Sequence, residues 1–225
     1  QIKEVGAPIQ NLFGGVCIPN NFIDDLYNND DKAWTIWAKV LESRNKTGLP
    51  YLFFNDNVNA HKTTPEWYGY HQRHKDFYIK SSNLCTEIML PCNNFWSFVC
   101  CLISVNLAKW EEWRYSNVVE LGIYLLDAIM EEFIEKTEVI KELKKARNFA
   151  KDNRALGLGV LGWHTLLQTK DLPFLGIQAN SLTRIIFDQI NNQSEEATLK
   201  LVTDFGLEPS KIGDGKRRNS TRLAI

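Results

Sequence analysis

The sequence predicts an α/β fold in which short strands alternate with amphipathic helices. Apolar residues recur at helical spacing in several segments, short β-prone runs stand between those segments, and no repeat or low-complexity stretch interrupts the pattern. With 225 residues, of which 44% are hydrophobic and 24% charged, the chain has enough apolar mass for a sizeable core. We therefore expect one domain, or part of a larger one, over residues 1–225.

In the first quarter of the chain, a strand, a helix and a second strand are predicted in that order. The stretch VCIPNNFIDDLY indicates a short strand and a turn, with Asn20 or Asn21 as the expected cap of the segment that follows. A helix then ends at the stop signals Gly48 and Pro50, and the β-prone run 51–54 comes next. The helical spacing is that of Ala33, Trp34, Trp37, Val40 and Leu41.

The rest of the chain is predicted to hold a long loop, a short strand and two main helices. Residues 56–82 are polar and aromatic without a clear period, which is typical of a functional or flexible excursion. A short strand is expected at 88–91, an amphipathic helix at 117–136 and a long helix at 180–206. The predicted core face of the first helix is Val118, Leu121, Leu125, Ile129 and Phe133, with Glu120, Asp127, Glu131 and Glu132 largely off it.

Composition and charge exclude several classes of protein. The net charge of −1 argues against an extended nucleic-acid or membrane-binding surface, which normally needs a clear basic excess. No apolar run approaches the ~20 residues that span a bilayer. The N-terminal sequence QIKEVGAPIQ lacks a signal-peptide pattern. We therefore expect a soluble, cytoplasmic protein, and the start at Gln1 with the apolar end RRNSTRLAI predicts a segment of a longer polypeptide.

The five cysteines are too few for a disulfide scaffold, and their number is odd, so free thiols in a reducing compartment are expected. Cys17 and Cys92 are expected only to pack. Cys100 and Cys101 are neighbours in a β-prone run, so their side chains should point to opposite faces and no bridge between them is expected. A metal site is not expected, because no C-x-x-C or H-x₃₋₅-H pair has zinc spacing.

The stretch SSNLCTEIMLP, residues 81–91, sets an amide, a thiol and a carboxylate at alternate positions: Asn83, Cys85 and Glu87. If the segment is extended, all three side chains project to one face, because strand side chains have a period of two. A nearby carboxylate raises the pKa of a thiol, so the thiol suits a hydrogen or radical carrier better than an anionic nucleophile. The alternative is a buried Cys85 between a turn-forming Asn83 and a solvated Glu87.

Two further motifs are expected to be structural. The run GLGVLG at 157–162 lacks the G-x-G-x-x-G spacing of a dinucleotide site, which favours close backbone packing. The basic and polar run near the end of the chain is expected to form a solvated turn. It consists of Lys216, Arg217, Arg218, Asn219, Ser220, Thr221 and Arg222.

Several stretches, in collinear order, resemble the large, catalytic subunit of class I ribonucleotide reductases, closest to the phage and bacterial members. SNLCTEI resembles the family's active-site finger loop, and WAKVLESRNKTGLPYLFFND is similar to the helix-strand unit before it. SFVCCLISVNLAKW is similar to the strand with a redox cysteine, RALGLGVLGW to a glycine-rich segment, and RRNSTRLAI to the start of the phosphate-binding segment. The resemblance implies part of the family's ten-stranded α/β barrel, with the finger loop around 81–91.

The resemblance implies a role for each polar residue of the loop. Cys85 would carry the transient thiyl radical that abstracts the ribose 3'-hydrogen. Glu87 would be the general base on the 3'-hydroxyl, and Asn83 would orient the sugar hydroxyls by hydrogen bonds. Ser82 would be a further substrate contact.

Outside the loop, the resemblance implies a redox cysteine and several partners. Cys100 would be one of two cysteines that reduce the 2' position and become a disulfide, and its register favours it over Cys101. The substrate would be a ribonucleoside diphosphate, and a metal-containing small subunit would supply the radical. Thioredoxin or glutaredoxin would be the reductant, the whole protein would be a homodimer, and ATP or dNTP effectors would bind outside this segment. No directly bound cofactor, nucleic acid or membrane is expected.

Alternatives to this interpretation stay open. A cobalamin-dependent, class II reductase shares the N-x-C-x-E core. A non-catalytic split-gene fragment that complements another chain, or a thiol-rich binding module, belongs to a different class. The partner redox cysteine, the radical-relay tyrosines and the phosphate loop would lie outside the chain, so the isolated segment is not expected to turn over. Diphosphate and triphosphate substrates are both compatible with the sequence.

Overall fold

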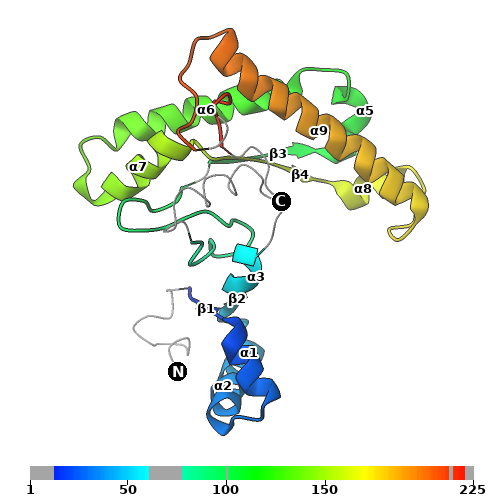
Figure 1. Ribbon diagram of the computed structural model, residues 1–225. Coiled ribbons are helices and arrows are strands. Elements are labelled where there is room, and N and C mark those ends of the chain that lie inside the picture. Colours follow the sequence, from blue (N-terminus) through cyan, green and yellow to red (C-terminus); the bar gives the residue numbers. More distant parts are fainter. Residues whose placement is uncertain (1–12, 61–77, 100, 213–214, 221–225) are drawn as a thin grey trace. The chain divides into compact units, whose positions relative to one another are not determined.

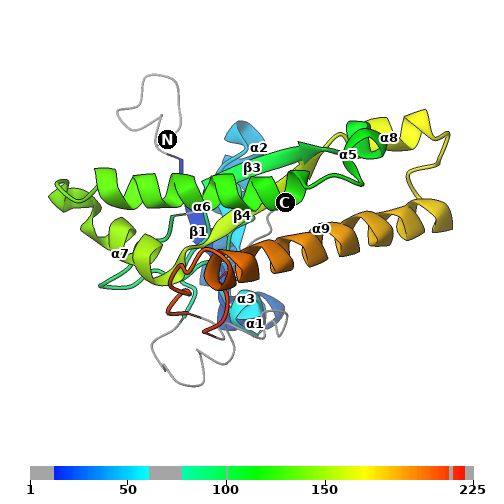
Figure 2. The same cartoon turned by 90° about the horizontal axis from the view of Figure 1, so that it is seen from above.

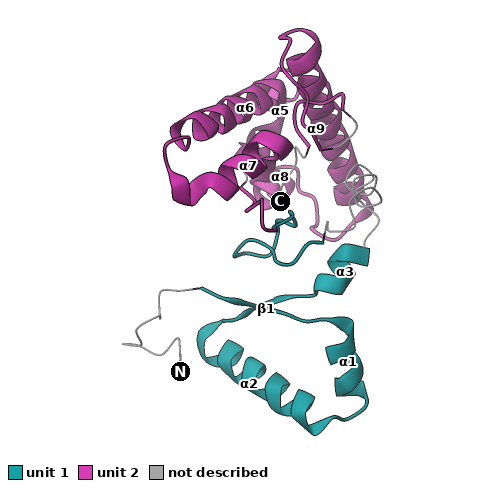
Figure 3. Ribbon diagram, turned by 60° about the vertical axis from the view of Figure 1, so that its left-hand side comes forward, with its two compact units in different colours: residues 1–92 teal, residues 93–225 magenta. Residues whose placement is uncertain are grey.

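The computed structural model describes residues 13–60, 78–99, 101–212 and 215–220. The chain divides into two compact units, residues 1–92 and 93–225, and each is described by itself (Figure 3). Strands alternate with helices in both units, which confirms the predicted α/β class. That all 225 residues form one barrel domain stays a prediction.

Unit 1 is built on a parallel pair of short strands, β1 (Gly15–Cys17) and β2 (Tyr51–Phe53). Parallel strands need a long crossover, which helices α1 (Asn20–Tyr27) and α2 (Asp31–Thr47) supply here (Figure 1). Helix α3 (Asn55–Ala60) follows β2 directly. It occupies the start of the stretch that was predicted to be irregular, and residues 61–77 of that stretch lie outside the described residues.

The C-terminal end of α2 follows the predicted stop signal, and its start is set by a side-chain cap that was not predicted. The Asp30 carboxylate accepts the N–H of Ala33 at 2.7 Å, and Gly48 ends the helix at a φ of +74°, with its N–H bonded to the Arg44 carbonyl at 2.8 Å. The expected cap of α1 is wrong. Asn20 is the first helical residue, and its N–H is satisfied by the Asp56 carboxylate from α3 at 2.7 Å.

Unit 2 is built on a second parallel pair, β3 (Cys101–Asn106) and β4 (Leu156–Leu161). The two long helices, α6 (Val118–Lys136) and α9 (Ile177–Thr203), lie side by side over this pair (Figures 1 and 2). The shorter helical elements are η1 (Leu107–Lys109), α5 (Trp110–Trp113), η2 (Lys141–Leu143), α7 (Lys144–Asn153) and α8 (Trp163–Thr169). The long helices confirm both predicted helical segments.

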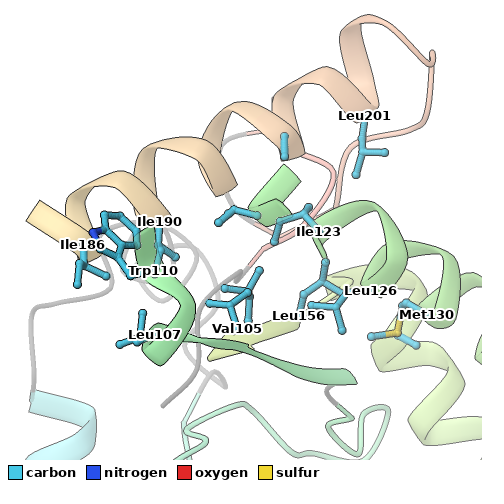
Figure 4. Packing of buried hydrophobic residues seen from close by; sticks show 14 of the residues in the cluster. Val105, Leu107, Trp110, Ile123, Leu126, Met130, Leu156, Ile186, Ile190 and Leu201 are labelled. Carbon is cyan, nitrogen blue, oxygen red and sulfur yellow. The ribbon is translucent and has the colours of Figure 1, made fainter. Parts of the chain in front are cut away.

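The core of unit 2 lies between the strands and the long helices. Figure 4 shows Val105, Leu107, Trp110, Ile123, Leu126, Met130, Leu156, Ile186, Ile190 and Leu201 gathered there. The predicted core face of α6 is wrong by about one position, because Leu121 and Leu125 are 53% and 55% exposed. Gly122 explains the shift: a Cβ there would lie 3.0 Å from Ile103, so its absence lets the helix approach the strands on this side.

The glycine run forms β4, which pairs along its whole length with β3. At Gly162, just after the strand, φ is +78°, and a Cβ would lie 2.5 Å from the side-chain oxygen of Asn106. That oxygen accepts the N–H of Ala108 at 3.0 Å and so caps η1. Close backbone packing, as expected from the sequence, is the role of this glycine.

Gly162→Ala is expected to destabilise unit 2 by about 2 kcal/mol, because it adds left-handed backbone strain and disrupts the Asn106 cap. Gly206→Ala is the matched control: φ there is +66° but nothing lies within 4 Å of a Cβ, so only the backbone strain is added. Urea unfolding of the two variants measures the difference. Equal losses of stability would contradict the steric contribution at Gly162.

A buried ionic network corrects the expectation of a solvated basic turn. Arg218 is 8% exposed, and Asn219 is fully buried. Asp127 on α6, 5% exposed, accepts hydrogen bonds from Arg154 at 3.1 Å, Arg218 at 3.3 Å and Asn219 at 2.8 Å. Glu131, one turn further along α6, accepts from both arginines at 2.8 and 3.1 Å. Arg218 can be buried because two carboxylates on one helix face neutralise its charge and that of Arg154.

In the parts of the chain that the structure describes, none of the helices combines the length and apolar character needed to cross a membrane.

Candidate active site

The finger loop, residues 81–91, is a closed turn and not the extended segment that the sequence predicted. Residues 84–86 form the turn, Thr86 has a φ of +65°, and its N–H donates to the Asn83 carbonyl at 3.1 Å. The expected strand at 88–91 is also absent, since these described residues are irregular. The period-two argument for a shared face therefore does not apply to this loop.

The Asn83 side chain closes the loop. Its Oδ1 accepts the N–H groups of Glu87 at 3.1 Å and Ile88 at 2.9 Å, and the backbone N–H of Asn83 donates to the Ile88 carbonyl at 3.3 Å. Asparagine oxygens compete with strand pairing in this way, which explains why the alternating pattern did not become a strand. The Asn83 side chain thus holds the loop together, in addition to the contact with substrate that the resemblance assigns to it.

Cys85 lies exposed in the turn, between Asn83 and Glu87, which are joined by the hydrogen bond from the Glu87 N–H to the Asn83 Oδ1. Glu87 is half-buried, and its Oε2 atom is buried without a hydrogen-bond partner among the described residues. An unsatisfied buried oxygen is costly, so Glu87 is poised to accept a hydrogen bond from a bound hydroxyl group. Of the alternative interpretation, the turn-forming Asn83 is observed, whereas the Cys85 thiol is exposed and Glu87 is half-buried.

A cavity of about 310 Å³ lies in unit 1, against the finger loop. This volume is at the lower end of the range of ligand pockets. It is lined by Phe13, Gly15, Cys17, Tyr51 and Phe53 and, from the loop, by Ser81, Ser82, Asn83, Leu84 and Thr86. Of the predicted site residues, Ser82 and Asn83 therefore face one cavity, while the Ser82 hydroxyl also donates to the Asn83 carbonyl at 2.8 Å.

Cys17 is not the packing cysteine that the sequence predicted. It is exposed, lies at the end of β1, and its thiol donates to the Lys80 carbonyl at 3.2 Å. Cys92, by contrast, is half-buried. No local pattern indicates the position of Cys17, because the contact joins residues 63 positions apart.

Of the two candidates for the redox cysteine, the structure describes only Cys101. Cys100 lies outside the described residues. Cys101 is the first residue of β3, opposite Leu156 in β4, and burial raises the pKa of its thiol. The preference for Cys100 over Cys101 stays a prediction.

The histidines of the predicted excursion, His61, His71 and His74, also lie outside the described residues. Over the described ranges, no three His, Cys, Asp or Glu side chains form a group that could hold a metal ion.

Comparison with known proteins identifies the family. The model of the ribonucleotide reductase barrel domain matches residues 24–211. A solved structure, the class Id ribonucleotide reductase alpha subunit of Actinobacillus ureae, has a TM-score of 0.85 and 40% identity, over 99% of this chain and 42% of that one. The chain therefore belongs to the ribonucleotide reductase family, and its fold is part of that family's barrel.

Curated relatives agree on the subunit. The ribonucleoside-diphosphate reductase large subunit of Invertebrate iridescent virus 3 is 32% identical over 187 residues, which are 83% of this chain and 28% of the relative. The ribonucleoside-diphosphate reductase subunit alpha of Chlamydia trachomatis is 30% identical over 188 residues, which are 81% of this chain and 16% of the relative. The chain spans less than half the length of each of these three proteins.

Proposed function

We propose that this chain is part of the catalytic subunit of a class I ribonucleotide reductase, which reduces ribonucleoside diphosphates to 2'-deoxyribonucleotides. The observation that carries the proposal is the finger loop of a reductase barrel, with Cys85 exposed between Asn83 and Glu87. The names of the relatives support a diphosphate substrate. The exposed thiol and the unsatisfied Glu87 oxygen support a hydrogen-abstraction site.

The chemistry assigns one step to each residue. A thiyl radical on Cys85 takes the ribose 3'-hydrogen atom and becomes a thiol, while Glu87 accepts the proton of the 3'-hydroxyl group. The 2'-hydroxyl takes a proton from one of two cysteine thiols, Cys100 and one outside this chain, and leaves as water. The same two thiols supply two electrons and the hydrogen that the 2' carbon gains, and they become a disulfide. Cys85 then returns its hydrogen atom to the 3' carbon and Glu87 returns its proton to the 3' oxygen, which regenerates the radical and the carboxylate.

Several partners follow from this proposal. A separate metal-containing small subunit generates the radical, and thioredoxin or glutaredoxin reduces the disulfide. The whole protein is a homodimer whose ATP and dNTP effectors bind outside this segment. Free thiols with these roles need a reducing compartment, so we place the protein in the cytoplasm.

The test is nucleotide reduction by the whole protein that carries this chain, with a ribonucleoside diphosphate and a dithiol reductant. Parallel reactions contain the metal-containing small subunit, adenosylcobalamin, or neither. We expect deoxynucleotide only with the small subunit. Turnover with adenosylcobalamin alone would assign the chain to the cobalamin-dependent class, and no turnover in any reaction would refute the proposed function.

A further inference from the structure

Asn59, on α3, holds the backbone just before the finger loop with both ends of its amide group. Its Nδ2 donates to the Ile79 carbonyl at 2.9 Å, and its Oδ1 accepts the Ile79 N–H at 2.9 Å. The same Nδ2 donates to the Asn55 carbonyl, one turn back on α3, at 2.7 Å. Two bonds to one residue fix both the position and the orientation of its backbone.

The residue before Ile79 is held from the same helix. The Tyr78 hydroxyl donates to Asp56 at 2.9 Å and accepts from the Asn55 amide at 2.7 Å. Asp56 also accepts the Asn20 N–H, and these two bonds, that from Asn20 first, lower the pKa of its carboxyl. Burial is the main cause that raises the pKa of Tyr78. At neutral pH the carboxylate is therefore charged and the phenol keeps its proton, so the bond between them is retained.

The residue after Ile79 is held from the strand pair, through the bond from the Cys17 thiol to the Lys80 carbonyl. Residues 78–80, which we name the leading segment, are thus bonded one after another to α3 or to the end of β1. The internal bonds of the finger loop begin only at Ser82 and Asn83. The loop is therefore a small closed unit whose N-terminal end is attached to the strands and helices of unit 1 through the leading segment.

We propose that Asn59 is a positioning residue for the reaction at Cys85. This inference rests on the proposed function. Asn59 does not line the cavity. It acts through Ile79 of the leading segment, which lies six positions before Cys85. Among the bonds to that segment from the described residues, the Asn59 pair alone fixes both backbone groups of one residue.

The expected effect is on the rate of hydrogen transfer and not on substrate affinity. Hydrogen abstraction needs the reacting atoms at close range, and a misplacement of about 1 Å can lower a rate about 100-fold. Loss of the Asn59 bonds should displace the loop relative to the cavity wall formed by the strands. The strand side of the cavity is unchanged, and Ser82, Asn83 and Cys85 move together because the loop is closed by its own bonds, so substrate binding should change less than turnover.

The test uses the whole protein with its radical-generating subunit. Asn59→Ala is expected to lower kcat about tenfold to 100-fold, with KM and substrate Kd within about twofold of the wild type. Asn59→Asp keeps the acceptor for the Ile79 N–H but sets a carboxylate oxygen against the carbonyls of Ile79 and Asn55, so it should lose at least as much. Asn57→Ala, at an exposed position on the same short helix, is the matched control and should retain wild-type kcat.

A 3'-deuterated substrate separates positioning from a merely structural role. If Asn59 positions the thiol, hydrogen abstraction becomes slower in Asn59→Ala, and the deuterium isotope effect on kcat increases. If the substitution only lowers the fraction of folded protein, kcat falls while the isotope effect stays unchanged. That result would overturn the inference. Wild-type kcat in Asn59→Ala would overturn it too. If the wild type itself makes no deoxynucleotide, the proposed function fails, and this inference fails with it.

Discussion

Cys85→Ser is expected to abolish nucleotide reduction by the whole protein while nucleotide binding stays near normal. Serine is close to cysteine in size but cannot carry a sulfur-centred radical. The loop should survive the change, because Cys85 is exposed and the bonds that close the loop use the backbone and the Asn83 side chain. Exposed substitutions of this kind usually alter stability by less than about 0.5 kcal/mol. The effect is therefore a loss of chemistry, not of fold.

Equilibrium nucleotide binding and steady-state reduction, measured on the same preparation, check this prediction. Cys92→Ser is the matched control, because Cys92 lies seven positions further on, is half-buried and has no proposed role in the reaction. It should keep wild-type turnover. Substantial nucleotide reduction by Cys85→Ser would rule out a thiyl radical at Cys85 and would refute the proposed class of enzyme.

The sequence predicted best those features that depend on near neighbours in the chain. The helix at 31–47 ends at Gly48 and leads into β2, as the glycine and the β-prone run indicated. Its start is set by Asp30, three residues from the amide that it caps. Local signals suffice here because each bond joins residues less than about one helical turn apart.

The sequence failed where a distant contact decides the outcome. The apolar residues of α6 cover more than one face, and packing against β3, β4 and α9, with Gly122 close to Ile103, selects the buried one. With the face shifted by one position, Asp127 becomes a core residue that needs partners. Those partners come from segments 27 to 92 residues away, which no local pattern can indicate.

The finger loop shows the same limit within a candidate active site. The residue types at 83, 85 and 87 pointed to the proposed chemistry, and the role of each residue stays a prediction. Their geometry was wrong, because the alternating pattern suggested a strand and the Asn83 side chain makes a turn instead. The attachment through Asn59 was missed because nothing in the helix sequence NDNVNA distinguishes Asn59 from Asn57. Only the bonds to Ile79 do so.

Asp127→Ala is expected to destabilise unit 2 by about 3 kcal/mol, since it removes one partner of a buried ionic network. Arg154 and Arg218 would keep only Glu131 as a carboxylate partner, and its side chain is 47% exposed, so solvent screens its charge. Asn219, fully buried, would lose its shortest bond in the network. Uncompensated positive charge in the interior of unit 2 is the physical cause of the loss.

Amide hydrogen exchange in the whole protein measures this effect locally. The N–H groups of Arg218 and Ser220 bond to the carbonyls of Thr198 and Asn153, so they report on whether the basic run stays docked. A loss of about 3 kcal/mol corresponds to exchange about 100-fold faster at these amides. Glu135→Ala, at an exposed position on the same helix, is the matched control and should leave both amides protected. Unchanged protection in Asp127→Ala would mean that Glu131 alone neutralises the two arginines, and that the run is held by its backbone bonds.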